Sequence, residues 1–133
     1  MKRIIFAILL ATAVTTGIAM AQNKKACAPR HESAVVEFPQ TVMVNAVFLR
    51  GSYLVIHDEA RMAKGENCTY IYEYTDKQQG RLVTSFHCTP VERERVSQFT
   101  VLLAPLGQSP GGIRRVTAIQ FAGSTEAHQL PAD

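Results

Sequence analysis

The sequence lacks the basic clusters that mark proteins which bind nucleic acid or anionic membranes. After residue 21, no run of Lys and Arg is longer than two residues. The full chain has 14 Lys and Arg and 11 Asp and Glu. Without residues 1–21, which include Lys2 and Arg3, 12 Lys and Arg remain and the formal net charge is +1. Partners of that kind need a basic surface. We therefore expect no nucleic-acid partner and, after the leader is cleaved, no membrane partner.

Long apolar runs are also scarce. The sequence has one, and it lies at the N-terminus. Lys2 and Arg3 precede an apolar stretch over residues 4–13, and residues 19–21 read Ala-Met-Ala. The stretch is shorter than the roughly 20 residues that cross a bilayer. Its order of charge, apolar stretch and small-residue site is typical of a secretory signal peptide. The sequence predicts a signal peptide over residues 1–21 and an exported protein, either periplasmic or secreted.

Helical periodicity is almost absent from the rest of the chain. Short β-branched or aromatic runs alternate with Gly, Pro, Asp and Asn, which favours strands separated by turns. We predict strands over residues 34–38, 41–49, 52–57, 68–75, 81–88, 97–103 and 114–121, a turn at Arg50-Gly51 and one helical turn over 59–63. The predicted fold is all-β: a small antiparallel β-sandwich or open barrel of about seven short strands. It forms a single domain over residues 34–133, after a flexible leader over 22–33.

The hairpin around residues 76–80 is the most clearly specified. Alternation places Tyr70, Tyr72 and Tyr74 on one face of its first strand. A turn centred on residue 78 would place Cys68 opposite Cys88, although a left-handed Gly80 would move this register by a residue or two. We expect the tyrosines to pack against the other sheet, because the opposite face is polar. If they are exposed, they form a ligand-binding platform for sugars or peptides.

Three cysteines are present, Cys27, Cys68 and Cys88. Exported proteins meet an oxidising compartment, so we predict a disulfide between Cys68 and Cys88 that stabilises the domain by roughly 3 kcal/mol. Cys27 is then left over. It is a free thiol, an intermolecular bridge in a dimer, or an alternative partner for one of the other two.

Three histidines in the predicted domain suggest a metal hypothesis, since imidazole is a common ligand of zinc and copper. His57 and His87 each end a predicted strand and could share one rim of the fold, while His128 lies on the tail after the last strand. His87 and Cys88 point to opposite faces of a strand and so cannot readily share one ion. The alternative is that all three are ordinary surface histidines.

No catalytic or cofactor motif is present. His57 with Asp58, and Ser85 with His87, are residue types that serine hydrolases use, but no nucleophile elbow surrounds Ser85. We therefore predict a non-catalytic binding or accessory protein whose partner is an unknown protein or small ligand. Two alternatives remain open: an exported zinc- or copper-binding protein that uses the surface histidines, and a small secreted hydrolase with a polar cleft around His57, Asp58 and His87.

Overall fold

The computed structural model describes residues 28–108 and 110–132, so the predicted signal peptide and Cys27 lie outside the described residues. The described chain contains β1 (His31–Val44), β2 (Val47–Asp58), α1 (Glu59–Ala63), β3 (Thr69–Thr75), β4 (Gln78–Phe86), β5 (Thr89–Glu92), β6 (Thr100–Pro105), β7 (Arg114–Gln120) and β8 (Glu126–Gln129). The all-β prediction is confirmed, and so is the short helix over residues 59–63. No helix in this part of the chain has the length and apolar character needed to cross a bilayer.

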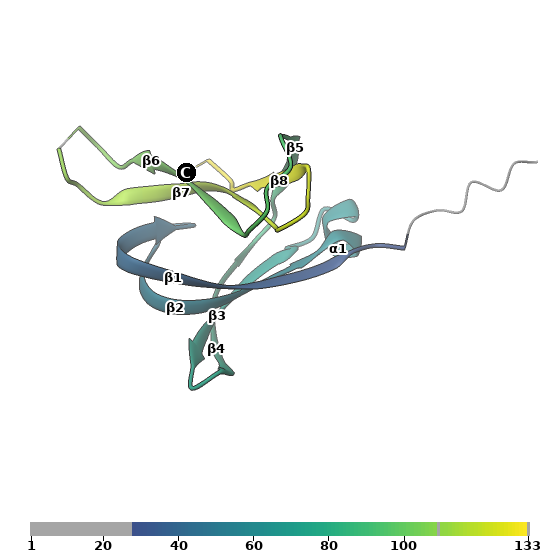
Figure 1. Ribbon diagram of the computed structural model, residues 1–133, viewed down its shortest axis with the longest axis horizontal. Coiled ribbons are helices and arrows are strands. Elements are labelled where there is room, and N and C mark those ends of the chain that lie inside the picture. The colour runs from purple at the N-terminus through teal and green to yellow at the C-terminus, as the bar shows by residue number, and fades with distance from the viewer. Residues whose placement is uncertain (1–27, 109, 133) are drawn as a thin grey trace, which may run out of the picture.

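The strands form one open mixed sheet of eight strands in the order β4-β3-β2-β1-β7-β8-β5, with β6 paired to the other edge of β7. Figure 1 shows β1–β4 on one side of the molecule and β5–β8 on the other. The predicted purely antiparallel arrangement is wrong at one place, because β1 and β7 pair in parallel at Val42↔Arg114 and Met43↔Arg115. This pairing joins the two halves, since β7 shares one edge between β1 and β8.

The first hairpin, formed by β1 and β2, has a tight turn that contains no glycine. β1 begins at His31, continues through Pro39 with a shift of register, and ends at a turn whose two central residues, Asn45 and Ala46, have φ of 46° and 62°. Two successive positive φ values are typical of the tight turn that matches the twist of a hairpin. The predicted turn at Arg50-Gly51 is wrong, because Gly51 lies inside β2.

The second hairpin has a different register from the one predicted. Its turn lies at residues 76–77, both with positive φ, and Thr69 faces Phe86. A slip of one residue exchanges the faces of a strand. Thr69 and Ile71 are therefore the buried residues of β3, at 0% and 3% exposed, while the three tyrosines are only half-buried on the outer face. The expectation that the tyrosines pack in the core is wrong.

Two short strands complete the fold beyond the predicted ones. β5 and β8 pair in antiparallel fashion over four residues each, with Pro90 opposite His128. Both strands are rich in polar residues, and the four residues of β5 are all exposed. β5 lies between the predicted strands 81–88 and 97–103, and β8 lies in the predicted tail, so His128 is held in the sheet.

The core lies between the two halves of the sheet. It consists of apolar residues from both halves, together with the two cysteines: Phe38, Val42, Val44, Leu49, Val55, Cys68, Ile71, Phe86, Cys88, Val116, Ile119, Phe121 and Leu130. Toward the end of the molecule where α1 and β8 lie (Figure 1), polar side chains replace the apolar ones. Among them are His57 and His128, at 1% and 0% exposed.

Candidate metal centre

Two buried histidines from opposite halves of the sheet lie against each other. His57 is the penultimate residue of β2, and His128 lies in β8 opposite Ile119 of β7. Their rings stack with centroids 3.8 Å apart and planes inclined by 30°, and the Phe121 ring lies 6.2 Å from His57 and 6.0 Å from His128. These are therefore not the surface histidines that the sequence suggested.

The ring nitrogens of this pair have no hydrogen-bond partners. Nδ1 and Nε2 of both His57 and His128 are buried and unpaired among the described residues. Buried polar groups are normally satisfied, and an unsatisfied one costs about 1–3 kcal/mol. Gln120, on the neighbouring strand β7, follows the usual pattern, because its Nε2 donates to the carbonyl oxygens of Glu94 at 2.8 Å and Ser124 at 2.9 Å. The two histidines depart from this pattern together with the carboxylates beside them, since Glu32 Oε2 and Glu126 Oε1 are also buried and unpaired among the described residues.

A cysteine completes a set of three donors. Cys88 lies between β4 and β5 and is 0% exposed. One ligand atom each of His57, Cys88 and His128, the sulfur of Cys88 among them, all lie within 4.8 Å of one another. In tetrahedral coordination, a nitrogen and a sulfur bound to the same zinc ion lie about 3.6 Å apart, given bonds of about 2.1 and 2.3 Å. Side-chain shifts of up to about 1 Å would therefore let the three donors share one ion.

A carboxylate faces both rings. Glu32 of β1 lies opposite His57 in the sheet, and its Oε2 is 3.7 Å from His57 Nδ1 and 3.7 Å from His128 Nε2. On the far side of His128, Glu126 Oε1 lies 3.9 Å from Nδ1. These distances are too long for hydrogen bonds. Carboxylates beside ligating histidines orient the rings and raise their basicity, which makes Glu32 and Glu126 suitable neighbours of a metal ion.

Burial sets the protonation states of the three donors. Burial lowers the pKa of His57 to about 4, and burial together with the neighbouring His57 lowers the pKa of His128 to about 4. Burial and the hydrogen bond with Cys68 raise the pKa of the Cys88 thiol to about 12. At neutral pH both imidazoles are therefore uncharged with a free lone pair, whereas the thiol must give up its proton when a metal binds.

The predicted disulfide is not formed in this structure. The Sγ atoms of Cys68 and Cys88 lie 2.9 Å apart, against about 2.05 Å for a bonded pair, and both cysteines are free. The disulfide required Cys68 directly opposite Cys88, whereas the observed register pairs Thr69 with Phe86 and offsets the two cysteines. Cys68 Sγ instead accepts a hydrogen bond from the Cys88 backbone N–H at 3.3 Å.

His87 does not join the other two histidines. It is exposed, and its Nδ1 lies 2.9 Å from the backbone oxygen of Glu66. Its neighbour Cys88 points inward and takes the third position of the cluster. Of these two adjacent residues between β4 and β5, His87 is therefore exposed and only Cys88 is buried in the core.

His57, Asp58 and His87 differ in their burial and in their contacts. Asp58 caps α1, where its side chain accepts a hydrogen bond from the backbone N–H of Arg61 at 3.2 Å. His57 is 1% exposed, so a substrate in solution cannot reach its ring. Of the three residues that the hydrolase alternative required in one polar cleft, His57 is thus buried, Asp58 caps α1, and His87 is exposed beside Glu66.

The tyrosine row has internal contacts at its first member. The Tyr70 hydroxyl donates to the backbone oxygen of Asn67 at 2.8 Å and accepts from Arg61 Nη1 at 2.8 Å. The Arg61 guanidinium carbon also lies 5.6 Å from the centroid of the Tyr70 ring. This ring therefore packs against its own chain and supports the loop after α1, while Tyr72 and Tyr74 are half-buried beside it.

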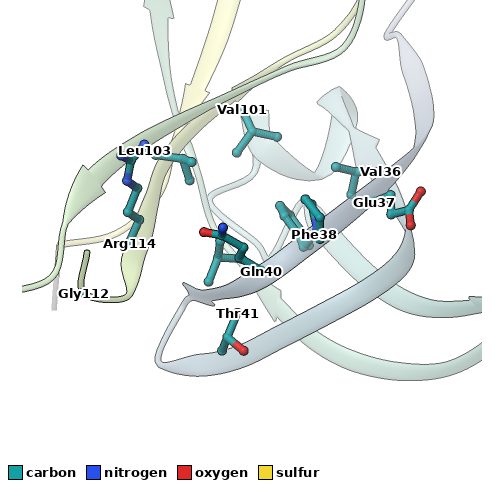
Figure 2. Close-up of a pocket in the computed structure, with 11 residues that line it drawn as sticks. Val36, Glu37, Phe38, Gln40, Thr41, Val101, Leu103, Gly112 and Arg114 are labelled. Atoms are coloured by element: carbon teal, nitrogen blue, oxygen red, sulfur yellow. The ribbon is translucent and has the colours of Figure 1, made fainter.

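An apolar cavity lies elsewhere in the fold. It has a volume of about 350 Å³, opens between β1 and the β6–β7 pair, and is lined by Val36, Glu37, Phe38, Pro39, Gln40, Thr41, Val42, Val101, Leu103, Gly112 and Arg114. Figure 2 shows Val36 and Phe38 on one side of this space and Val101 and Leu103 on the other. Neither cysteine nor histidine contributes to its lining, so it offers no imidazole or thiolate donor for a transition metal.

Sequence reasoning missed two residues of the candidate site, one of the three donors and one neighbouring carboxylate. Cys88 was assigned to a disulfide, and Glu32 was assigned to a flexible leader although it belongs to β1. Cys88 carried a usable signal, because it ends a predicted strand beside a candidate ligand and faces inward.

Comparison of the chain with protein-family models, with curated proteins and with solved structures finds no match. Its function must therefore be argued from the geometry of this site.

Proposed function

We propose that this chain is an exported, non-catalytic protein that binds one transition-metal ion, zinc or copper, through His57, Cys88 and His128. The observation that supports this most directly is the set of buried, unpaired ring nitrogens beside a buried sulfur. Metal coordination would satisfy one nitrogen of each ring and so offset a cost that the metal-free fold carries. The residue types agree as well, since imidazole and thiolate are the donors that zinc and copper favour.

The burial of the donors supports binding without catalysis. All three proposed ligands are at most 1% exposed. Catalytic zinc sites keep one coordination position open to water or substrate, whereas closed sites hold the metal for structure or transport. A closed centre of this kind is consistent with a binding or accessory role.

Export is the second part of the proposal. It rests on Lys2 and Arg3, the apolar stretch over residues 4–13 and the Ala-Met-Ala sequence at residues 19–21. These features predict that the mature chain begins at Gln22. The mature protein would then meet zinc and copper outside the cytoplasm.

The experiment is a metal titration of the mature chain, purified metal-free under reducing conditions and followed by native mass spectrometry. We expect one Zn²⁺ or one Cu⁺ per chain. His57→Leu, Cys88→Ser and His128→Leu should each lose the ion, while His87→Leu, a matched histidine exchange at an exposed neighbour, should keep it. Circular dichroism of each variant shows that it folds. Failure of the wild-type chain to take either ion, or loss of the ion in His87→Leu, would refute the proposed site.

A further inference from the structure

A methionine thioether lies beside the proposed centre. Met62 is half-buried in α1, and its Sδ is 3.7 Å from Cys88 Sγ. α1 begins two residues after His57, with Asp58 as its N-cap, so a stretch of six residues carries both a proposed nitrogen ligand and this sulfur. Two sulfurs bound to one ion at about 2.3 Å lie at most about 4.6 Å apart. The observed separation is within that limit.

The chemistry of a thioether discriminates between metals. Zinc in proteins is held by thiolate, imidazole and carboxylate, and the thioether is not among its usual ligands. Thioethers favour Cu⁺, and two imidazoles with one thiolate and a long thioether bond form a known type of mononuclear copper site. A methionine sulfur is also a donor without a proton, so it needs no deprotonation before it binds. Met62 would therefore contribute to copper binding and not to zinc binding.

The second thiol does not fill the same role as Met62. Cys68 Sγ lies 2.9 Å from Cys88 Sγ. Two thiolates bound to one ion in tetrahedral geometry lie about 3.7 Å apart, given bonds of about 2.3 Å. Cys68 is thus too close to Cys88 for both to bind the same ion without movement, whereas Met62 already lies at about that separation from Cys88.

Resting on the proposed function, we propose that the centre is a copper site in which Met62 Sδ is the fourth ligand, beside His57, Cys88 and His128. Of these four ligands only the thiolate carries a charge, so the set would neutralise a single positive charge of the ion, which suits Cu⁺. Glu32, whose carboxylate faces both rings at 3.7 Å, would hold the imidazoles in place.

The test compares Cu⁺ and Zn²⁺ binding in Met62→Leu, a substitution that nearly conserves side-chain volume. Each affinity is measured under anaerobic, reducing conditions by competition with a chromophoric chelator. We expect Met62→Leu to weaken Cu⁺ binding at least about tenfold, which is about 1.4 kcal/mol, and to leave Zn²⁺ binding unchanged. Met43→Leu, the same exchange in β1, is the control and should change neither affinity. X-ray absorption of the Cu⁺ form should show two sulfur ligands in the wild type and one in Met62→Leu.

The outcomes separate this inference from the proposed function. Equal Cu⁺ affinity in the wild type and Met62→Leu, or an equal loss of both metals, would overturn the role of Met62 while the His57, Cys88 and His128 site stands. A wild-type chain that binds neither metal would overturn the proposed function itself.

Discussion

Replacement of one buried histidine by leucine should stabilise the metal-free protein while abolishing metal binding. His128 is 0% exposed, and both of its ring nitrogens lack hydrogen-bond partners among the described residues. Relief of these unsatisfied groups is worth about 2–3 kcal/mol. Leucine has a similar volume but a different shape, which costs up to about 1.5 kcal/mol in a packed core. We expect His128→Leu to gain about 1 kcal/mol at pH 7.5.

Gln120→Leu is the matched control, because it also places leucine at a buried polar position. Gln120 is 1% exposed, and its Nε2 donates to the backbone oxygens of Glu94 and Ser124. Its removal leaves two acceptors without their donor, so we expect a loss of about 1–3 kcal/mol. The same kind of substitution should therefore act in opposite directions at two neighbouring sites.

The assay is thermal and urea denaturation of the mature chain in a chelator and a reductant, repeated with metal. A gain of 1 kcal/mol raises the melting temperature of a domain of this size by roughly 4 °C. Added metal should stabilise the wild type by about 2.7 kcal/mol when the free metal is a hundredfold above the dissociation constant, and should leave His128→Leu unchanged. A loss of stability in His128→Leu comparable to that in Gln120→Leu would refute the claim that the ring nitrogens are unsatisfied.

Two further predictions concern pH and a turn. Because the pKa values of His57 and His128 fall from 6.5 to about 4 on folding, the unfolded chain takes up protons first. Each group should therefore destabilise the metal-free protein by roughly 2 kcal/mol between pH 7.5 and 5, about 4 kcal/mol for the two together, and most of the loss is complete at pH 4. The Glu32 carboxylate lies 3.7 Å from a nitrogen of each ring, so it favours the protonated rings and reduces this loss. Urea titrations that give the same stability at pH 7.5 and 5 would contradict the predicted loss. Ala46 has φ of 62°, a conformation that costs an L-residue about 1 kcal/mol. Ala46→Gly should therefore raise the melting temperature, and an unchanged or lower melting temperature would show that Ala46 is not strained.

Local patterns were sufficient for much of the secondary structure. The run from Cys68 to Cys88 predicted a hairpin with cysteines near its open end, and residues 59–63 predicted a helical turn. Such elements depend on neighbours along the chain, so their signals survive in the sequence. The register of this hairpin was predicted wrongly, because its turn lies at residues 76–77, where two non-glycine residues have positive φ.

Weak elements were missed for a related reason. β5 and β8 have four residues each and are largely polar, so neither shows the alternation that predicts a strand. They are stabilised by pairing with each other, and β8 also pairs with β7. The parallel contact of β1 with β7 likewise joins segments about 70 residues apart.

The sequence by itself determined that this is a β-rich chain, that His57 and Cys88 lie at or near the ends of hairpin strands, and that Cys88 and not His87 faces the core. Only the tertiary structure decided that His128 reaches them. That contact depends on β8 pairing with β7 and on the two halves of the sheet closing over one core. Long-range pairing of this kind leaves no local periodicity, because each donor meets its partners across the sheet and not along the chain.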